Sequence, residues 1–571
     1  MTDRDSRTPG EDGDDGVAGA PETGPLANGA QETGLQETGP NANGAQATGP
    51  QATGPANGAQ APGPAPGTAP LPIGRQEIPS DEPDVLPTKA PRGRPTAKGA
   101  LVVGARGITG LVAVAVAVTA IIGATLFTAP EYRISPLSRD ITPVAAAQQR
   151  VCPGPLLRLG DDEGSGASIA SSVGRAAAAF QSSPDTAEST GLATTDNTVG
   201  LPPLLLTLPP ASTTFNEDSS PAVAGSQSQE IASGDLNGFA AAECAEPGSD
   251  IWLAGGATDV GRSTLITLSN PTTVIATVAL TIYSEAGEVA APGAEGIVIP
   301  PGAQRILSLA GFAPDVLSPV VRVQSSGGQV VANLQHSVVR TLAPGGVEIV
   351  GATRAPALSA VIPGFVVSGG EAVATAQTAG GFDDLRSVLR VLVPGDEAAA
   401  VTVRITPDRE EPLDGFELEL AAGQVTDTAL DGLEDGRYTV TVQSDVPVVV
   451  GVRASIVQAD NSSDFLWLGA AERLRDTSLA SIAPGPAPRL HLVNPTEEDA
   501  SVRIVAGSGA TTTIELPAGE AASSPVVAGD DLVLTGTAGL LAAVTYEGVG
   551  SFSAFHLSAP GPGSTGITVF G

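Results

Sequence analysis

Lysine, cysteine, histidine and aromatic residues are all scarce in this chain of 571 residues. Lysine occurs only at Lys89 and Lys98, and the formal net charge is −34. Because contacts with nucleic-acid phosphates need clustered Lys and Arg, this charge predicts that the chain has no nucleic-acid partner. Aromatic residues make up only 3% of the chain, so the exposed aromatic platforms that carbohydrate-binding sandwiches use are not expected.

Sequence patterns for catalysis or metal binding are also missing. Only three histidines are present, and none stands in an HExxH or other i, i+4 arrangement. No GxSxG nucleophile motif occurs. The acidic turn at 431–436, DGLEDG, lacks the ligand spacing of a calcium loop. We therefore expect no catalytic residue, no cofactor and no metal site, and a protein that is not an enzyme.

Each histidine has a structural interpretation. His336 is in phase with the apolar residues of an expected strand, which predicts a buried, hydrogen-bonded ring rather than a ligand. His491 alternates with Leu490 and Leu492, which predicts an exposed position. The surroundings of His556, SAFHLSA, leave its position open.

One long apolar segment is present, at 107–129, and it contains no charged residue. This length is sufficient to cross a hydrocarbon core of about 30 Å as a helix, and no cleavage site follows at the usual distance, so a retained single-pass anchor is predicted. Basic residues are denser before the segment than after it, which places the N-terminus in the cytoplasm and the remainder outside the cell.

The segment before this helix, residues 1–98, repeats short phrases such as QETGLQETGP. It has almost no aromatic or β-branched residues, so it cannot bury enough apolar surface to fold. We predict a disordered low-complexity cytoplasmic tail, either a solvated spacer or a partner-binding segment.

Both cysteines, Cys152 and Cys244, follow the predicted helix. On the oxidising side of a membrane, two thiols most simply form one disulfide. The competing interpretation is a lipid-modified Cys152, but QQRVC lacks the small residues that precede a lipidated cysteine. Between the cysteines, Ser-, Gly- and Pro-rich tracts predict a membrane-proximal, loop-rich region over 130–249.

A repeated phrase organises the rest of the chain. ITLSNP at 266–271 and LHLVNP at 490–495 both alternate apolar and polar residues, which predicts a strand with one buried face. The strand should end in a turn at Asn270 and Pro271, and again at Asn494 and Pro495. LRVLVPG at 389–395 is a degenerate middle copy.

Each copy continues into further alternating strands with turn residues every 8 to 12 positions. This spacing predicts a mainly β fold of three tandem immunoglobulin-like antiparallel β-sandwich repeats, at 250–356, 371–457 and 463–571. In GLEDGRYTV, Tyr438 is placed to form a tyrosine corner, its hydroxyl bonded to upstream backbone. Trp252 and Trp467 stand at what the sequence suggests are matching repeat positions, as core anchors rather than binding residues.

Four phrases resemble a family of anchored envelope proteins from high-GC Gram-positive bacteria, the domain-of-unknown-function family 5719. They are VCPGP after a transmembrane helix, IWLAGG, the LxLxNP phrase and the PG turn of IVIPPGAQR. The resemblance implies a membrane-bound, extracytoplasmic location and no established activity.

These features together predict a non-enzymatic, single-pass envelope protein with a structural or interaction role. Its partner would be cell-wall polymer or another envelope protein, and one helix would contact the membrane. The alternative is an envelope hydrolase or transferase whose site lies within 153–250 or at an interdomain cleft.

Overall fold

The computed structural model describes residues 138–141, 147–160, 170–194, 200–210, 222–378, 382–559 and 567–570. In these ranges the protein is mainly β, with antiparallel sheets and one α-helix, α2 (Gly370–Gln377). No helix among the described residues is both long and apolar enough to cross a membrane. The predicted tail at 1–98 and the predicted membrane helix at 107–129 lie outside these ranges.

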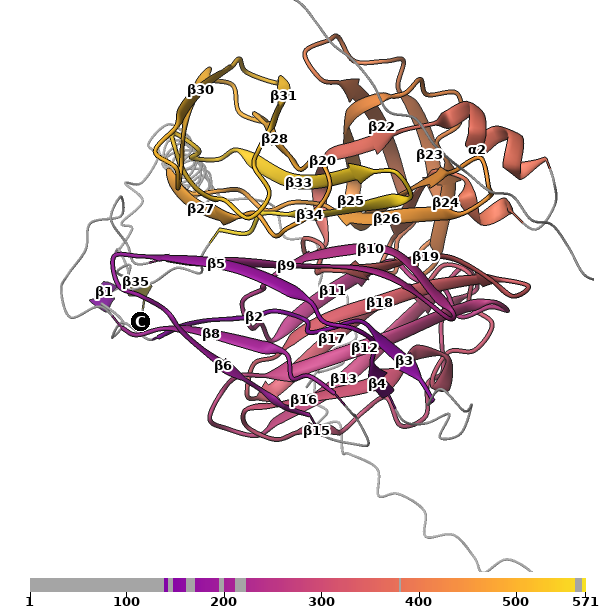
Figure 1. Ribbon diagram of the computed structural model, residues 1–571, viewed down its shortest axis with the longest axis horizontal. Helices are drawn as coiled ribbons and strands as arrows, with labels where there is room; N and C mark the ends of the chain where they lie inside the picture. Colours follow the sequence, from indigo (N-terminus) through magenta and orange to yellow (C-terminus); the bar gives the residue numbers. More distant parts are fainter. Residues whose placement is uncertain are drawn as a thin grey trace, which may run out of the picture. The chain divides into compact units, whose positions relative to one another are not determined.

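Three pairs of sheets follow one another from residue 250 onward (Figure 1). The first pair has one sheet in the order β11-β17-β13-β14, with β15 also paired to β13, and another in the order β19-β18-β12-β16-β7, whose edge strand β7 (Ala193–Thr194) comes from the preceding region. Its strands are β11 (Asp250–Ala254), β12 (Arg262–Asn270), β13 (Ala276–Ser284), β14 (Gly287–Glu288), β15 (Ile297–Ile299), β16 (Ala303–Ser308), β17 (Val320–Gly327), β18 (Val331–Arg340) and β19 (Ala343–Val350), with the 3-10 helix η2 (Leu309–Gly311).

The second pair repeats this order as β20-β25-β22-β23 and β26-β25-β21-β24. One long strand, β25, takes the places of both β17 and β18, so it joins the two sheets. The elements are β20 (Ala357–Val367), η3 (Asp383–Leu385), β21 (Val388–Leu392), β22 (Ala399–Pro407), β23 (Phe416–Leu420), β24 (Val425–Ala429), β25 (Gly436–Val457) and β26 (Ser463–Gly469).

The third pair has the order β27-β32-β29-β30 and β34-β33-β28-β31. Its strands are β27 (Thr477–Ser481), β28 (Arg489–Val493), β29 (Ala500–Ala506), β30 (Thr511–Leu516), β31 (Ala521–Pro525), β32 (Asp531–Thr535), β33 (Leu541–Gly548) and β34 (Ser551–His556). The repeated phrases therefore form equivalent strands, β12, β21 and β28, each at an inner position of its sheet.

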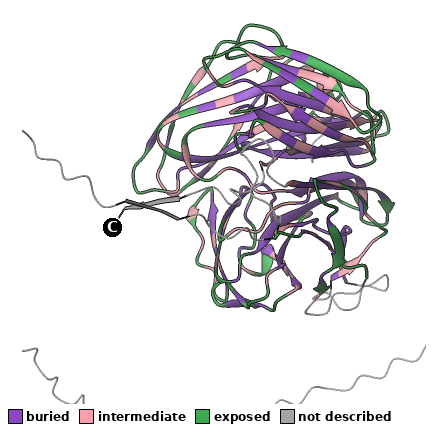
Figure 2. Ribbon diagram, turned by 90° about the vertical axis from the view of Figure 1, so that its left-hand side faces the viewer, coloured by how far each residue is buried: buried purple, intermediate pink, exposed green. Residues whose placement is uncertain are grey.

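The sheet pairs share their cores instead of standing in series. Phe465 and Trp467, from β26 of the second pair, pack in the core of the first pair. Phe552 and Ala554, from β34 of the third pair, pack in the core of the second. Figure 2 shows buried residues along the strands of the sheets, and exposed residues in the connecting loops and on parts of the outer strands. Residues 131–571 accordingly form a single compact unit.

Two expectations about the units are corrected by the strand pairing. β20 precedes the expected start of the second repeat at 371, yet it pairs with β25 of that repeat. β26 lies in the range expected for the third repeat, yet it also pairs with β25. A tight turn at 458–462, with Asn461 at φ 65°, folds β26 back onto the strand just before it.

The region predicted to be loop-rich, 130–249, contains strands where it is described. They are β1 (Ser138–Ile141, paired with β35, Ile567–Phe570), β2 (Gln148–Val151), β3 (Leu157–Leu159), β4 (Ala170–Ser172), β5 (Ala177–Ser183), β6 (Glu188–Gly191), β7 (Ala193–Thr194), β8 (Leu204–Leu208), β9 (Ala222–Ser233) and β10 (Leu236–Glu243). β10 lies against β19 of the first pair and β34 of the third (Figure 1).

Much of the tract that predicted loops, at 211–221, lies outside the described residues, but β9 and β10 were not expected as strands, because they are rich in small and polar residues with little intrinsic strand preference. Small side chains allow neighbouring elements to approach closely, and most residues of both strands are buried. Tertiary packing therefore stabilises a structure that local sequence does not favour.

Candidate functional site

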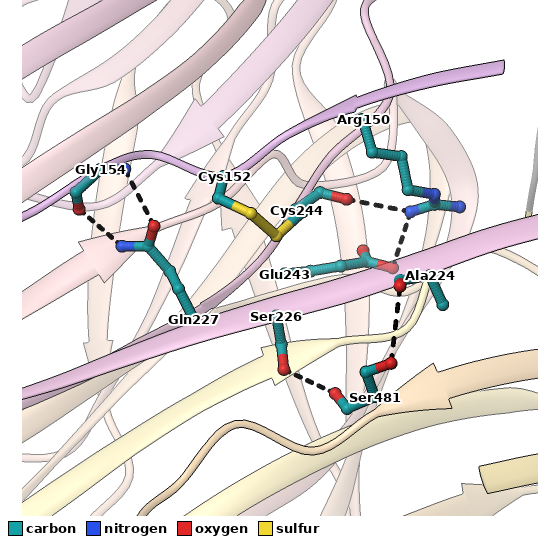
Figure 3. The surroundings of a disulfide bond; sticks show 9 residues. All are labelled: Arg150, Cys152, Gly154, Ala224, Ser226, Gln227, Glu243, Cys244 and Ser481. Atoms are coloured by element: carbon teal, nitrogen blue, oxygen red, sulfur yellow. Dashed lines mark hydrogen bonds and ion pairs between the residues drawn. A yellow bond between two sulfur atoms is a disulfide. The ribbon is translucent and has the colours of Figure 1, made fainter. Parts of the chain in front are cut away.

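The disulfide between Cys152 and Cys244 is present, as the sequence predicted. It links residues 92 positions apart with their Cα atoms 4.0 Å from each other, and both side chains are buried. In Figure 3 the bond lies between the segment after β2 and the end of β10. The chain has no other cysteine.

Polar side chains around the disulfide connect several segments (Figure 3). Arg150 is buried and donates to Glu243 at 3.0 Å and to the Cys244 carbonyl at 3.1 Å. Gln227 both accepts from the Gly154 N–H and donates to the Gly154 carbonyl, at 2.9 and 2.6 Å. These contacts join the segment after β2 to β9 and to the end of β10, which is typical of a structural element.

The two Asn-Pro turns are confirmed, and the structure adds what their side chains do. Asn270 is fully buried, and its amide donates to the carbonyls of Val274 and Ile299 at 2.8 and 3.0 Å. Asn494 does the same with Glu498 and Leu516 at 2.7 and 3.0 Å. Each Asn therefore ties its turn to a neighbouring strand, a role that local turn preference alone does not reveal.

Pro271 and Pro495 follow these asparagines directly, where strands β12 and β28 have ended. Tyr438 lies at the start of β25, and its hydroxyl donates to the Glu434 carbonyl at 2.7 Å, which is the upstream backbone bond that the sequence predicted. Burial raises the pKa of Tyr438.

The two tryptophans are buried, but they do not occupy matching positions. Trp252 lies on β11, in the first sheet of its pair, whereas Trp467 lies on β26, in the second sheet of its pair. Trp252 stacks on Tyr283 with ring centroids 6.1 Å apart. The expected equivalence was wrong because β26 closes the second pair rather than opening the third.

His336 is buried and its Nδ1 lies 3.2 Å from the Trp467 Nε1, as a buried, hydrogen-bonded histidine should. The prediction for His491 was wrong. Its ring is 1% exposed and bonds to Thr545 Oγ1 at 2.8 Å, because both faces of β28 are covered, one by its own core and the other by β20. Burial lowers the pKa of His491 to about 3. His556 is partly buried, and burial lowers its pKa as well.

A charged cleft of about 330 Å³ lies between the first and second sheet pairs, and it is the strongest candidate for a ligand site in the described part of the chain. Four arginines and four aspartates line it together with His336 and Trp467. The charged lining residues are Arg262, Arg386, Arg390, Arg453, Asp259, Asp383, Asp384 and Asp427. Sequence reasoning missed this cleft because its residues come from separate strands and loops of two repeats.

Arg390 fixes one wall of the cleft. Its guanidinium lies 4.5 Å from the Trp467 ring centroid and pairs with both carboxylate oxygens of Asp427, at 2.8 and 2.9 Å. The remaining donors bond to backbone carbonyls of the first pair, at Gly256 (2.9 Å), Pro319 (3.0 Å) and Leu317 (3.2 Å). Every donor is used, so Arg390 joins the two sheet pairs and has no free group for a ligand.

Asp384 is the shared partner of a second group of arginines at the cleft. Arg340 pairs with both of its oxygens, at 2.9 and 2.6 Å, and Arg453 and Arg262 each approach to 3.4 Å. Burial opposes ionisation of Asp384, but these guanidiniums outweigh it and lower the pKa. Burial lowers the pKa of Arg453 to about 10, so this arginine stays charged at neutral pH.

The chemistry that this cleft supports is binding through charge and hydrogen bonds. Ser318 donates to Asp427 at 2.8 Å, and His336 is bonded to Trp467, so hydroxyl and imidazole do not form a nucleophile and base pair. Within the described ranges no group of His, Cys, Asp and Glu is arranged to hold a metal ion.

The protein is thus a β-rich protein of repeated sheet pairs, with one disulfide bond and a charged cleft. The chain belongs to DUF5719, a family of unknown function, whose family model matches residues 207–526. No curated protein matches it. A crystal structure titled Thermotoga maritima 1070 is similar at 19% identity over 20% of this chain and 93% of the other, with a TM-score of 0.17.

Proposed function

We propose that this chain is a non-enzymatic, membrane-anchored protein of the cell envelope that acts by binding another envelope component. The observation that carries the proposal is the buried disulfide between Cys152 and Cys244. Structural disulfides form in oxidising compartments, and this one follows the apolar segment at 107–129, which would supply the anchor.

The sheet pairs support a binding role. We infer that they are immunoglobulin-like repeats, which hold a surface away from the membrane to contact cell-wall polymer or another envelope protein. Their shared cores join the sheet pairs into one compact unit, which suits presentation of a surface.

Protease treatment of intact protoplasts tests the location and orientation. With epitope tags at both ends, external protease should destroy the C-terminal tag and spare the N-terminal one. Protoplasts opened with detergent are the matched control, and both tags should then be lost. Survival of the C-terminal tag in intact protoplasts would contradict the proposal.

A pulldown with the purified full chain tests the binding role. We expect it to retain cell-wall polymer or an envelope protein from a membrane extract, and to retain less when the disulfide is reduced beforehand. Turnover of wall polymer by the purified chain would instead support the hydrolase or transferase alternative.

A further inference from the structure

We propose that the charged cleft between the first and second sheet pairs binds a small organic acid that also carries hydroxyl groups, of the size and chemistry of a uronic acid. The inference does not depend on the location of the protein, because it rests on groups that line the cleft. Three of the residues that line it, His336, Arg453 and Asp259, each have one buried polar atom without a hydrogen-bond partner.

The histidine supplies a directed donor. The Trp467 indole N–H can only donate, so the Nδ1 of His336 accepts and the proton of the neutral ring is on Nε2. This Nε2 has no partner within the protein. Burial lowers the pKa of His336 well below its usual value, and the cations Arg453 and Arg390 act in the same direction, so the ring stays neutral and keeps this single donor.

The arginine supplies positive charge that the protein does not fully neutralise. The Asp384 carboxylate is shared among Arg340, Arg453 and Arg262, and Arg340 takes its two short contacts. Arg453 is left with a 3.4 Å contact, and its Nε has no partner. A guanidinium in a buried position gains most from a carboxylate, which it can bind through two parallel hydrogen bonds.

Asp259 requires that the ligand also donates a hydrogen bond. One of its carboxylate oxygens pairs with Arg262 at 3.0 Å, and the other, Oδ1, is buried without a partner. A simple anion would place negative charge beside this oxygen, whereas a hydroxyl group would donate to it. The three atoms together therefore match an acid with hydroxyl groups better than either a bare anion or a neutral sugar.

The size of the cleft limits the ligand to a small molecule. A volume of about 330 Å³ lies at the lower end of the range for ligand sites, which is suitable for one sugar-sized unit rather than a polymer chain. Arg390 and the Trp467 ring form one fixed wall of the cleft, which reduces the ordering cost of binding on that side.

Calorimetric titration of the full chain with glucuronate tests the proposal, with glucose and acetate as matched probes. We expect a dissociation constant of about 1 mM or lower for glucuronate and at least about tenfold weaker binding of the other two. Equal binding of acetate would show a plain anion site, equal binding of glucose a neutral sugar site, and no binding a purely structural cleft. Each of these results overturns the proposal.

Variants locate the site. Asp259→Asn should weaken the binding of glucuronate about tenfold or more, because a charged acceptor is replaced by a neutral amide. Asp250→Asn is the matched control, since Asp250 also pairs with an arginine, Arg322 at 2.7 Å, outside this cleft, and its affinity should equal wild type. Arg386→Ala, at a side chain about half exposed on the cleft, should fold normally and weaken binding several-fold. Unchanged affinity in Asp259→Asn and Arg386→Ala would exclude this cleft.

Discussion

The charged cleft and a second junction of the molecule bury carboxyl groups in opposite ways. In the cleft, Asp384 and Asp427 meet guanidiniums, which lower their pKa values despite burial. At the second junction, formed by β10, β19, β26 and β34 and called the sealed junction below, Asp464 and Glu348 are fully buried and meet backbone N–H and hydroxyl groups. Burial raises both of their pKa values well above normal.

The partners explain the contrast. Asp464 accepts from the N–H groups of Phe239 and Phe552 at 2.8 and 2.9 Å, and so joins β10 to β34. Such donors orient a carboxyl group, but they supply less charge than a guanidinium, and desolvation dominates. The sealed junction therefore uses buried carboxyl groups to hold strands together, whereas the cleft keeps charged groups beside an open volume.

The largest expected effect on stability comes from removing the disulfide. This bond belongs to neither junction, but it joins the end of β10 to the segment after β2. Replacing both Cys152 and Cys244 with Ser should lower the free energy of unfolding by about 4 to 5 kcal/mol in the chain-entropy model. Chemical denaturation of oxidised wild type and the double variant measures it, and reduced wild type is the control.

The same variant sharpens the comparison through protease sensitivity. Phe239 and Ala241 of β10 pack in the core of the third sheet pair. We therefore expect β27 to β34 to become sensitive to protease together with the segment between the two cysteines. Cleavage confined to 152–244 would show that the sealed junction holds without the disulfide.

Asp464→Ala breaks the sealed junction directly. The change leaves the N–H groups of Phe239 and Phe552 buried without an acceptor, and we expect a loss of about 3 to 5 kcal/mol in unfolding free energy. Asp460→Ala, at an exposed turn four residues earlier, is the control and should leave stability nearly unchanged. Similar values for both variants would remove the structural role assigned to Asp464.

Glu348→Gln should change how stability depends on pH. Because the folded pKa is raised, the folded state holds a proton that the unfolded chain loses above about pH 4.5, so stability falls as pH rises through the folded pKa. The neutral variant escapes this loss, and its melting temperature should rise relative to wild type as pH increases above about 4.5, where the unfolded carboxyl group loses its proton.

Two points make this measurement specific. The lowered pKa of His491, about 3, removes stability as pH falls below about 6.5, but it does so equally in wild type and in Glu348→Gln, so it cancels in the comparison. Glu417→Gln, at an exposed glutamate on β23, is the control and should follow wild type. Parallel curves for wild type and Glu348→Gln would contradict a proton held at the sealed junction.

The smallest effect is expected at Tyr438, away from both junctions. Tyr438→Phe removes the bond to the Glu434 carbonyl and should cost about 1 kcal/mol in unfolding free energy. Tyr546→Phe removes a comparable bond to the Ala483 carbonyl, at 3.0 Å and fully buried, and should cost at least as much. Unchanged melting of Tyr438→Phe would remove the tyrosine-corner interpretation.

Local pattern was sufficient where a residue's role depends on its neighbours in sequence. The alternation in ITLSNP and LHLVNP predicted β12 and β28, and Asn with Pro predicted the turns that end them. Tyr438 and the pairing of the two cysteines were predicted for the same reason, since a strand start and a count of two thiols are visible in the sequence.

The alternation of apolar and polar residues did not predict burial where another part of the protein covers the second face of a strand. His491 alternates correctly for exposure, but β20 from the second pair covers it. β10 has weak strand preference and forms a strand because β19 and β34 enclose it. The cleft was not predictable either, because Asp259, His336 and Arg453 come together only when two repeats pack.

The sequence by itself determined the β class, the repeated strands, their turns and the disulfide, because period-two alternation, turn chemistry and cysteine count act over short distances or need no partner. Only the tertiary structure decided which strands share a core, which carboxyl groups meet guanidiniums and where a cleft stays open. Those outcomes depend on the burial and charge of groups that lie far apart along the chain, and local sequence does not encode them.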